Sequence, residues 1–212
     1  MTLDGARLRG RQAEARRNDA RILAAALDVF AEDVAAPMSA VARRAGVGQA
    51  SLYRRYPTKD TLLAEVCERV MVSMGDAART ALDADHPGGA ALAGFLHWYV
   101  ESGALRLSAL LGAFTPPERL FTIAREVNLA MQALVDRAAA VGAIREDVTG
   151  ADLTLIATQI GALAGTDARR TRELRQRYLA LALQGLALTG AQKLPGRPPD
   201  ADELEAPWRA LR

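Results

Sequence analysis

The sequence predicts an all-α protein with a small N-terminal helix-turn-helix domain followed by a larger helical domain. Hydrophobic residues make up 50% of the 212 residues, but there are only four Phe, four Tyr and two Trp. A composition rich in Ala and Leu and poor in aromatic residues favours helix over sheet. Apolar residues recur at three- and four-residue spacing, and groups of Pro and Gly separate the periodic segments. The length allows a small domain joined to a larger one.

The first helix is expected to begin at Asn18. Residues 1–17 contain several arginines and little apolar sequence, so we expect them to form a flexible basic arm. Asn18 is a good N-cap, and Asp19 falls in the first turn, where the helix dipole favours an acid. The helix should end near Glu32 or Asp33. Its apolar face repeats at helical spacing and consists of Ile22, Leu23, Ala26, Leu27 and Phe30.

Two short helices are expected next, at 37–45 and 49–56. Pro37 suits the first position of a helix, and Gly46 stands where a left-handed residue is needed to end it. Gly48 opens the second helix, and Pro57 ends it because the residue before a proline avoids the α region. Two short helices joined by a glycine-containing turn have helix-turn-helix geometry, which places the second helix in the major groove of DNA. Residues 18–60 are therefore predicted to be a DNA-binding domain.

The charge distribution agrees with this interpretation. Residues 1–60 contain eleven Lys and Arg against seven Asp and Glu, a net +4, whereas residues 61–212 contain sixteen against eighteen, a net −2. No acidic residue occurs between Val34 and Lys59. Such a patch is typical of a surface that faces a polyanion, although a solvated basic face is the alternative on charge alone. The basic residues in it are Arg43, Arg44, Arg54, Arg55 and Lys59.

The second short helix carries side chains that can recognise bases. Gln49 can pair with adenine, Arg54 can contact guanine through two hydrogen bonds, and Ser51 can also contact base edges. Tyr53 and Lys59 suit phosphate contacts, which fix the register without reading sequence. Val41, Val47 and Leu52 are spaced to point back into a three-helix core.

The rest of the chain also predicts helices. Thr58 should cap a long helix from 58 to about 82, which links the two domains. Residues 61–190 are expected to form the larger domain, and residues 191–212 a loosely held Pro-rich tail. Further helices are expected at 89–102, 104–113, 117–141, 150–164 and 171–189.

Two segments resemble the tetracycline-repressor (TetR) family of transcriptional regulators. NDARILAAALDVFA, from Asn18 to Ala31, resembles the family's first helix. VARRAGVGQASLYRRYPTKDTLL, from Val41 to Leu63, resembles its helix-turn-helix and the start of the next helix. The sequence departs from the family at Pro37 and Gly48, where many relatives have a Ser or Thr cap. Together with the basic patch, the resemblance implies that the DNA-contacting residues are Ser39, Arg43, Gln49, Ala50, Ser51, Tyr53, Arg54, Arg55 and Lys59.

Members of this family are similar in having a variable helical second domain that dimerises and holds an inducer pocket. GAIREDVTGADL, from Gly142 to Leu153, resembles the loop that leads into the first dimerisation helix. We therefore expect a homodimer through helices at about 150–164 and 171–189, which matches a palindromic operator. The alternative is that these helices are central in the core. Their apolar residues include Leu155, Ile156, Ile160, Leu163, Tyr178, Leu181, Leu183 and Leu186.

An inducer pocket is expected among the helices of residues 89–141. Its candidate lining residues are Phe95, Trp98, Tyr99, Phe114, Phe121, Asn128, Met131 and Gln132, with His97 as a further polar contact. For the aromatic residues, core packing is the alternative. The two histidines and the single Cys67 are far apart in the sequence, so no metal site or cofactor is expected. Cys67 is expected to be a small apolar residue rather than a redox sensor.

The sequence as a whole predicts a cytoplasmic, homodimeric transcriptional repressor that a small apolar ligand releases from double-stranded operator DNA. The alternative is a regulator without a small-molecule inducer, either constitutive or controlled by a protein partner. An enzyme is not expected, because no nucleophile–base pair, metal cluster or phosphate-binding glycine loop is found. No apolar run approaches the length that spans a bilayer, so no membrane partner is expected.

Overall fold

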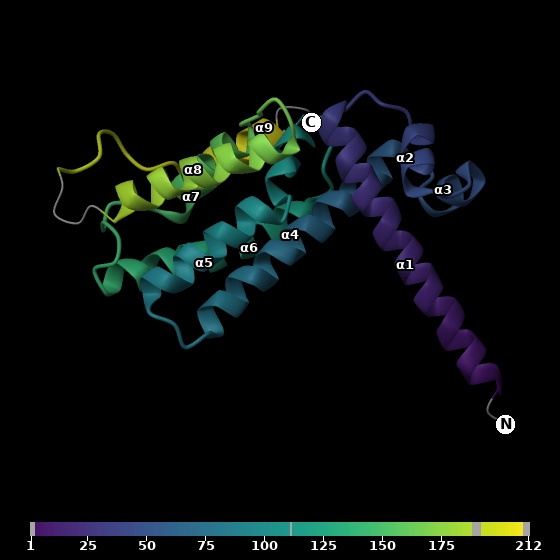
Figure 1. The fold of residues 1–212 in the computed structure, drawn as a ribbon, viewed down its shortest axis with the longest axis horizontal. Helices are drawn as coiled ribbons and strands as arrows, with labels where there is room; N and C mark the ends of the chain where they lie inside the picture. The colour runs from purple at the N-terminus through teal and green to yellow at the C-terminus, as the bar shows by residue number, and fades with distance from the viewer. Residues whose placement is uncertain (1–2, 111, 188–191, 210–212) are drawn as a thin grey trace. The chain divides into compact units, whose positions relative to one another are not determined.

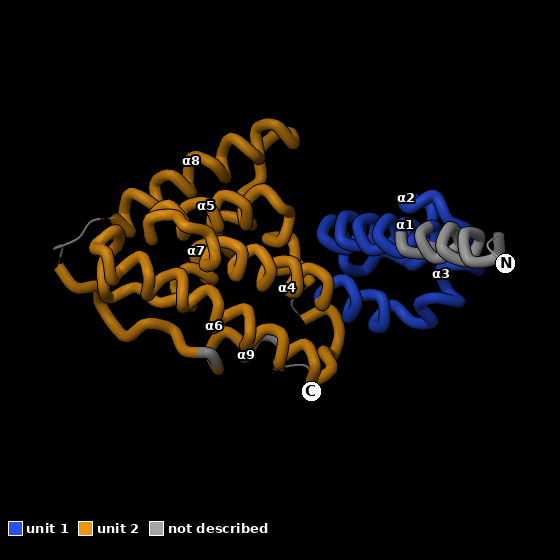
Figure 2. The backbone as a smooth tube through the Cα atoms, turned by 90° about the horizontal axis from the view of Figure 1, so that it is seen from below, with its two compact units in different colours: residues 1–67 blue, residues 68–212 orange. Residues whose placement is uncertain are grey.

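The computed structural model describes residues 3–110, 112–187 and 192–209. Every regular element in this part of the chain is a helix, which confirms the all-α prediction (Figure 1). The chain divides into two compact units, residues 1–67 and 68–212 (Figure 2). The elements are α1 (Leu3–Glu32), α2 (Met38–Ala45), α3 (Gln49–Arg55), α4 (Lys59–Asp83), α5 (Gly88–Glu101), the 3-10 helix η1 (Ala104–Leu110), α6 (Glu118–Ala140), α7 (Gly150–Gly161), α8 (Ala168–Leu186) and α9 (Ala201–Arg209).

The core of the first unit lies between α1, α2 and α3. α1 packs against α2, and α2 packs against α3. Phe30, Val41 and Leu52 are each fully buried, one from each of these helices. The expected apolar face of α1 is confirmed at Ile22, Leu23, Ala26 and Phe30, which are all buried. These contacts hold α3 in place through its one buried residue, Leu52.

α1 begins earlier than the sequence suggested. It starts at Leu3, so residues 3–17 of the expected flexible arm are helical and Asn18 lies inside the helix rather than at its cap. Residues 6–17 are rich in Ala, Arg, Gln and Glu, which have high intrinsic helix propensity and allow the helix to continue toward the N-terminus. Residues 1–2 of the expected arm lie outside the described residues.

The turns around α2 and α3 follow the expected chemistry. Gly46 has φ 66° and ψ 37°, the left-handed conformation that glycine adopts without a steric cost. Pro37 is the N-cap of α2 rather than its first helical residue, and Gly48 is the N-cap of α3. Neither cap has a side-chain hydrogen bond. Thr58 caps α4 as predicted, because its Oγ1 accepts a hydrogen bond from the Thr61 N–H at 3.1 Å.

The second unit is built around α5, which packs against α6, α7 and α8. α7 and α8 also pack against each other and run side by side in Figure 1. The buried core of the second unit includes Leu92, Phe95, Leu134 and Leu153. Within the described residues, no helix combines the length and apolarity needed to cross a bilayer.

Arg137, on α6, holds the chain that connects α4 to α5. Its guanidinium donates hydrogen bonds to the carbonyl oxygens of Leu82 (2.7 Å), Ala84 (3.3 Å) and His86 (2.5 Å). The C-terminal end of α4 is therefore attached to α6 through a charged donor and several backbone acceptors.

Several boundaries in this unit differ from the predictions. The helix expected at 104–113 is the 3-10 helix η1, which ends at Leu110. α8 begins at Ala168, before the expected residue 171, because the carboxylate of Asp167 accepts the Arg170 N–H at 2.8 Å and caps it. Residue 111 of the helix expected at 104–113 and residues 188–189 of the helix expected at 171–189 lie outside the described residues.

The expected loose tail is also ordered in part as a helix. Residues 201–209 form α9, and Asp200 and Glu203 cap it reciprocally: each carboxylate accepts the other residue's backbone N–H at 2.9 Å. Upstream, Arg145 donates to the Gln192 carbonyl at 2.7 Å, and Asp147 accepts the Leu194 N–H at 2.8 Å. Hydrogen bonding to Arg145 holds the pKa of Asp147 below its usual range. Residues 190–191 and 210–212, at the end of the expected larger domain and in the tail, lie outside the described residues.

Candidate DNA-binding surface and ligand cavity

α3 presents nearly all of its side chains to solvent. Leu52 is fully buried and anchors the helix, whereas Tyr53 on the next position is 46% exposed. A helix that uses one residue for packing and exposes the others is suited to insertion into a groove. The remaining exposed side chains of α3 are the predicted DNA contacts Gln49, Ala50, Ser51, Arg54 and Arg55.

Two arginines are available for a new partner. Arg43 on α2 and Arg54 on α3 are exposed, and within the described residues neither side chain has a hydrogen bond or ion pair. An exposed guanidinium of this kind can bind a guanine edge or a phosphate without breaking an internal contact. Ser39, the other predicted contact on α2, is half-buried.

The other basic residues of the predicted surface are already engaged. Arg55 pairs with Asp19 of α1 at 2.9 Å. The Lys59 ammonium donates to the carbonyl oxygens of Val34 and Ala36 (3.0 Å for the latter) and lies 4.7 Å from the centroid of the Phe30 ring. Lys59 therefore closes the loop between α1 and α2, and one of its three N–H groups remains for a phosphate. The sequence did not indicate this structural role.

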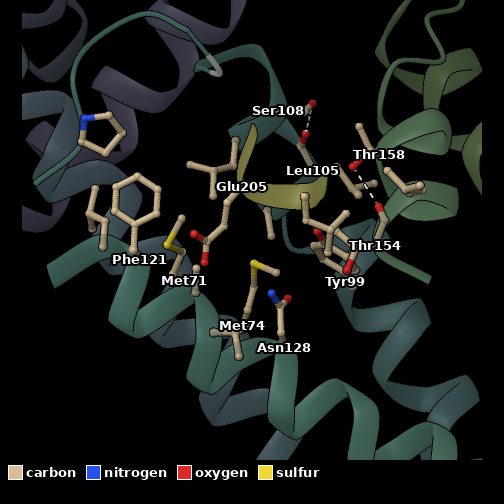
Figure 3. A pocket seen from close by; sticks show the side chains of 18 of the residues that line it. Met71, Met74, Tyr99, Leu105, Ser108, Phe121, Asn128, Thr154, Thr158 and Glu205 are labelled. Atoms are coloured by element: carbon tan, nitrogen blue, oxygen red, sulfur yellow. Dashed lines mark hydrogen bonds between the residues drawn. The ribbon is translucent and has the colours of Figure 1, made fainter. Parts of the chain in front are cut away.

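The second unit contains a cavity of about 210 Å³ (Figure 3). It is formed by side chains from α4, α5, η1, α6, α7 and α9 and by Pro116 in the segment before α6. It is larger than the roughly 150 Å³ apolar cavity that is known to bind benzene in an engineered protein. The lining residues are Met71, Met74, Tyr99, Ala104, Leu105, Leu107, Ser108, Pro116, Leu120, Phe121, Ala124, Val127, Asn128, Thr154, Leu155, Thr158, Glu203, Leu204 and Glu205.

The structure brings together only part of the predicted pocket. Tyr99, Phe121 and Asn128 line the cavity. Phe95, Trp98, Phe114, Met131 and Gln132 are not among its lining residues. Phe95 stacks on Trp98 and Tyr99 at centroid distances of 6.1 and 5.9 Å, and Met131 is buried in the core. Gln132 is engaged elsewhere, because it donates to Asp136 and accepts the Gly150 N–H, both at 2.8 Å. His97 is exposed.

Sequence reasoning missed most of the wall. Met71 and Met74 come from α4, Leu105 and Ser108 from η1, and Glu205 from α9. The two methionines occupy positions three residues apart and so share a helix face, which is the one signal that could have pointed to them. Nothing in the sequence indicates that this face meets α9.

Most hydroxyl groups in the cavity wall bond to their own helices. Thr154 donates to the Gly150 carbonyl at 3.1 Å, and Thr158 donates to the Thr154 carbonyl at 2.8 Å. Within the described residues, the Tyr99 hydroxyl and the Asn128 amide make no side-chain hydrogen bond. Burial raises the pKa of Tyr99 to about 12, so its phenol stays protonated at neutral pH. These two polar groups are available to orient a bound molecule.

Cys67, the only cysteine of the chain, is fully buried in α4. Burial raises the pKa of its thiol to about 12. Because the thiolate is the reactive form, this environment suits the predicted packing role.

A helix-turn-helix with exposed polar residues, joined to a helical unit with a partly open and mostly apolar cavity, is the organisation of a DNA-binding regulator. Residues 22–66 match the model of bacterial regulatory proteins of the tetR family, and residues 87–188 match the model of the SbtR-like transcriptional regulator C-terminal domain. No curated protein sequence matches the chain.

Solved structures give the same answer. A TetR transcription regulatory protein from Mycobacterium vanbaalenii is 31% identical, with 82% of this chain and 98% of that chain covered and a TM-score of 0.57. A TetR transcriptional regulator from Streptomyces coelicolor is 28% identical, with 79% and 97% covered and a TM-score of 0.58. The regulator LfrR from Mycobacterium smegmatis, in complex with proflavine, shares the fold at 21% identity, with 81% and 97% covered and a TM-score of 0.58. The chain belongs to the TetR family of transcriptional regulators, as its sequence motifs predicted.

Proposed function

We propose that this regulator is a homodimeric repressor that leaves its operator when a small apolar ligand fills the cavity of the second unit. The observation that carries this proposal is the cavity itself, about 210 Å³ and lined mainly by apolar side chains. A solid core in this region would have favoured a regulator without a small-molecule inducer. A regulator of this kind acts where the DNA is, so we place its action in the cytoplasm.

For DNA recognition we assign base reading to Gln49, Ser51 and Arg54. All three side chains are exposed on α3, and their functional groups match base edges in the major groove. Tyr53 and the engaged cations Arg55 and Lys59 are assigned to phosphates, which position the domain. Ser39, Arg43 and Ala50 complete the proposed contact surface.

For dimerisation we assign the outer faces of α7 and α8. Tyr178 and Leu181 on α8 are 48% and 51% exposed. Leu155 on α7 is 44% exposed and also lines the cavity. Covering these faces with a second copy would remove this apolar surface from water. A two-fold dimer also presents two α3 helices to a palindromic operator.

For the response to ligand we assign a role to α4. Met71 and Met74 line the cavity, and the same helix begins at Lys59 in the first unit. A ligand that contacts these methionines acts directly on a helix whose first turns belong to the DNA-binding unit. Release then requires that the ligand bind more tightly to the conformation with low operator affinity. The proflavine complex of the M. smegmatis regulator supports a small-molecule role for this fold.

Fluorescence anisotropy with labelled DNA from the region flanking the gene tests the DNA assignment. We expect nanomolar affinity that falls with added salt. Affinity no better than for shuffled DNA of the same composition would contradict the proposal. Analytical ultracentrifugation of the wild type and of Leu181→Glu tests the dimer: the wild type should have twice the mass of the chain, and the variant the mass of one chain.

The ligand assignment is tested on the preformed operator complex. Small aromatic compounds are added, and those that lower the anisotropy are tested again with Ala124→Leu, which places three extra carbon atoms in the cavity. The variant should bind DNA normally but lose the response. A response that is unchanged in Ala124→Leu would place the ligand elsewhere.

A further inference from the structure

The charged side chains in the cavity wall are all acidic. Its acidic side chains are Glu203 and Glu205, both from α9, and no Lys, Arg or His is among the lining residues. The two carboxylates differ in surroundings. The Glu203 side chain is 49% exposed, and its oxygens accept hydrogen bonds from Arg197 and from the Asp200 N–H. Glu205 is only 7% exposed and is the one charged residue that is buried within the described residues.

The two oxygens of Glu205 are not equally used. Oε2 accepts both hydrogen bonds from the Arg209 guanidinium, one of them from Nε at 2.9 Å. Oε1 has the Arg125 Nε at 3.6 Å, which is too long for a hydrogen bond. Within the described residues, Oε1 therefore accepts no hydrogen bond, although a carboxylate oxygen can accept two. Among the described residues, every fully buried side-chain oxygen or nitrogen has a hydrogen-bond partner, so Oε1 is not fully buried. It is an accessible acceptor on a mostly apolar wall.

Figure 3 shows where this acceptor lies. The Glu205 side chain descends from α9 toward Met71, with Phe121 and Met74 close by. Asn128 and Tyr99 lie farther along the cavity. The arrangement combines an apolar surface for a ring or short chain with a negative group at one end. Arg209 already pairs with Oε2 and Arg125 lies 3.6 Å from Oε1, so the carboxylate favours a positive donor that approaches Oε1 itself.

We infer that the ligand of this cavity is an apolar molecule with one protonated amine, which donates a hydrogen bond to Oε1 of Glu205. The inference rests on the proposed function, because it names the chemical class of the ligand for the same cavity. The two arginines do not prevent this contact. Arg209 donates to the other oxygen, Oε2, so it can stay in place. Arg125 is 50% exposed and pairs with Glu118 at 3.3 Å, so it can leave Oε1 to the amine.

The test uses three probes with one ring system: 1-naphthylmethylamine, 1-naphthylmethanol and 1-naphthoate. At neutral pH these carry an ammonium, a neutral hydroxyl and a carboxylate on the same apolar group. Isothermal titration calorimetry measures Kd for each probe with the full-length wild type, Glu205→Gln and Asp202→Asn. Asp202 is exposed on α9 and does not line the cavity, so its variant removes the same charge from the same helix.

In the wild type we expect the amine to bind at least about tenfold more tightly than the alcohol, because the bond to a buried carboxylate is charge-assisted. The carboxylate should bind most weakly. Glu205→Gln should bring the amine and the alcohol to within about twofold, and Asp202→Asn should keep the wild-type order. Circular dichroism shows whether each variant keeps its helix content.

Two results would overturn the inference, and they have different meanings. If the wild type binds the amine and the alcohol equally, the cavity accepts ligands but Glu205 does not select a cation, and the proposed ligand response still stands. If no probe binds the wild type, both the inference and the ligand part of the proposed function fail. Operator binding, measured separately by anisotropy, is independent of either result.

Discussion

The two units of this regulator build their candidate sites in opposite ways. In the first unit, α3 carries most of the proposed DNA contacts within Gln49–Arg55, and a single buried residue, Leu52, holds the helix in place. In the second unit, the cavity is formed by side chains that range from Met71 to Glu205 along the chain. A surface site depends on which residues a local motif exposes. A cavity depends on where distant elements fail to fill space.

The units also differ in how their cores use volume. The first has fully buried side chains from each of its helices α1, α2 and α3. The second also has fully buried side chains, such as Leu134 and Leu153, and beside them a partly open cavity of about 210 Å³. The apolar side chains that line this cavity lack the close-packed neighbours that a protein interior normally supplies, and a bound ligand would provide them.

The largest effect that we predict is in the first unit. Leu52→Ala should destabilise this unit by about 2–5 kcal/mol, because it leaves a cavity in a close-packed core. Hydrogen exchange followed by mass spectrometry on the full chain should show faster exchange in α2 and α3, with α5–α8 unchanged. Ser51→Ala, on the exposed neighbour, should change the stability by less than about 0.5 kcal/mol. Equal loss of protection in both units would mean that they unfold together.

Two Ala→Leu substitutions, one in each unit, should differ in their effect on the free energy of unfolding. Ala42 is 1% exposed in α2, and Ala42→Leu should cost about 1–3 kcal/mol of unfolding free energy through overpacking. Ala124 lines the cavity, so Ala124→Leu should be neutral or stabilise by up to about 1 kcal/mol. Urea unfolding followed by circular dichroism measures both. If Ala124→Leu is as destabilising as Ala42→Leu, the space in the second unit is not available to added atoms.

In the first unit, an arginine without an internal partner should contribute more to DNA binding than one that is already paired. Arg54 has no internal partner within the described residues, and Arg54→Ala should weaken operator binding at least about tenfold. Arg44 pairs with Asp28 at 3.3 Å, so Arg44→Ala should have a smaller effect. Anisotropy at one salt concentration compares them. A larger loss of operator affinity for Arg44→Ala than for Arg54→Ala would indicate that the DNA-contacting surface is not centred on α3.

The effect that is smallest at neutral pH concerns the phenol of Tyr99 in the cavity wall. Because the pKa of Tyr99 is raised to about 12 in the folded state, its contribution to stability is complete below pH 10, the usual tyrosine value, and is lost between about pH 10 and 12. Tyr99→Phe should therefore match the wild type at pH 7 and lose less stability as the pH rises through this window. Parallel curves for the two proteins from pH 9 to 12 would show that the Tyr99 phenol is not shielded from water. Thermal unfolding at each pH measures this difference.

Sequence reasoning succeeded where structure is local. The turn at Gly46, the stop at Pro57 and the cap at Thr58 each depend on a few neighbouring residues, and the structure has all three. The start of α1 was missed because the propensity of residues 6–17 outweighed a good cap signal at Asn18.

The cavity could be predicted only in part. Tyr99, Phe121 and Asn128 were found by their residue types. Phe95 and Trp98 have the same character but stack with each other in the packed region. Which aromatic residue faces a void is decided by helix rotation and by elements far away in the sequence. Glu205 was missed for a related reason, because its segment has the composition of an unstructured tail.

The hydrogen bonds from Arg137 give α4 one anchored end within the second unit. The last turn of α4 is held through the Leu82 carbonyl, and the chain that follows it is held through the carbonyls of Ala84 and His86. With a rise of about 1.5 Å per residue, Met74 is about 12 Å from Leu82 along the axis, which is little more than two turns. The part of α4 that lines the cavity therefore lies close to an end of the helix that is tied to α6.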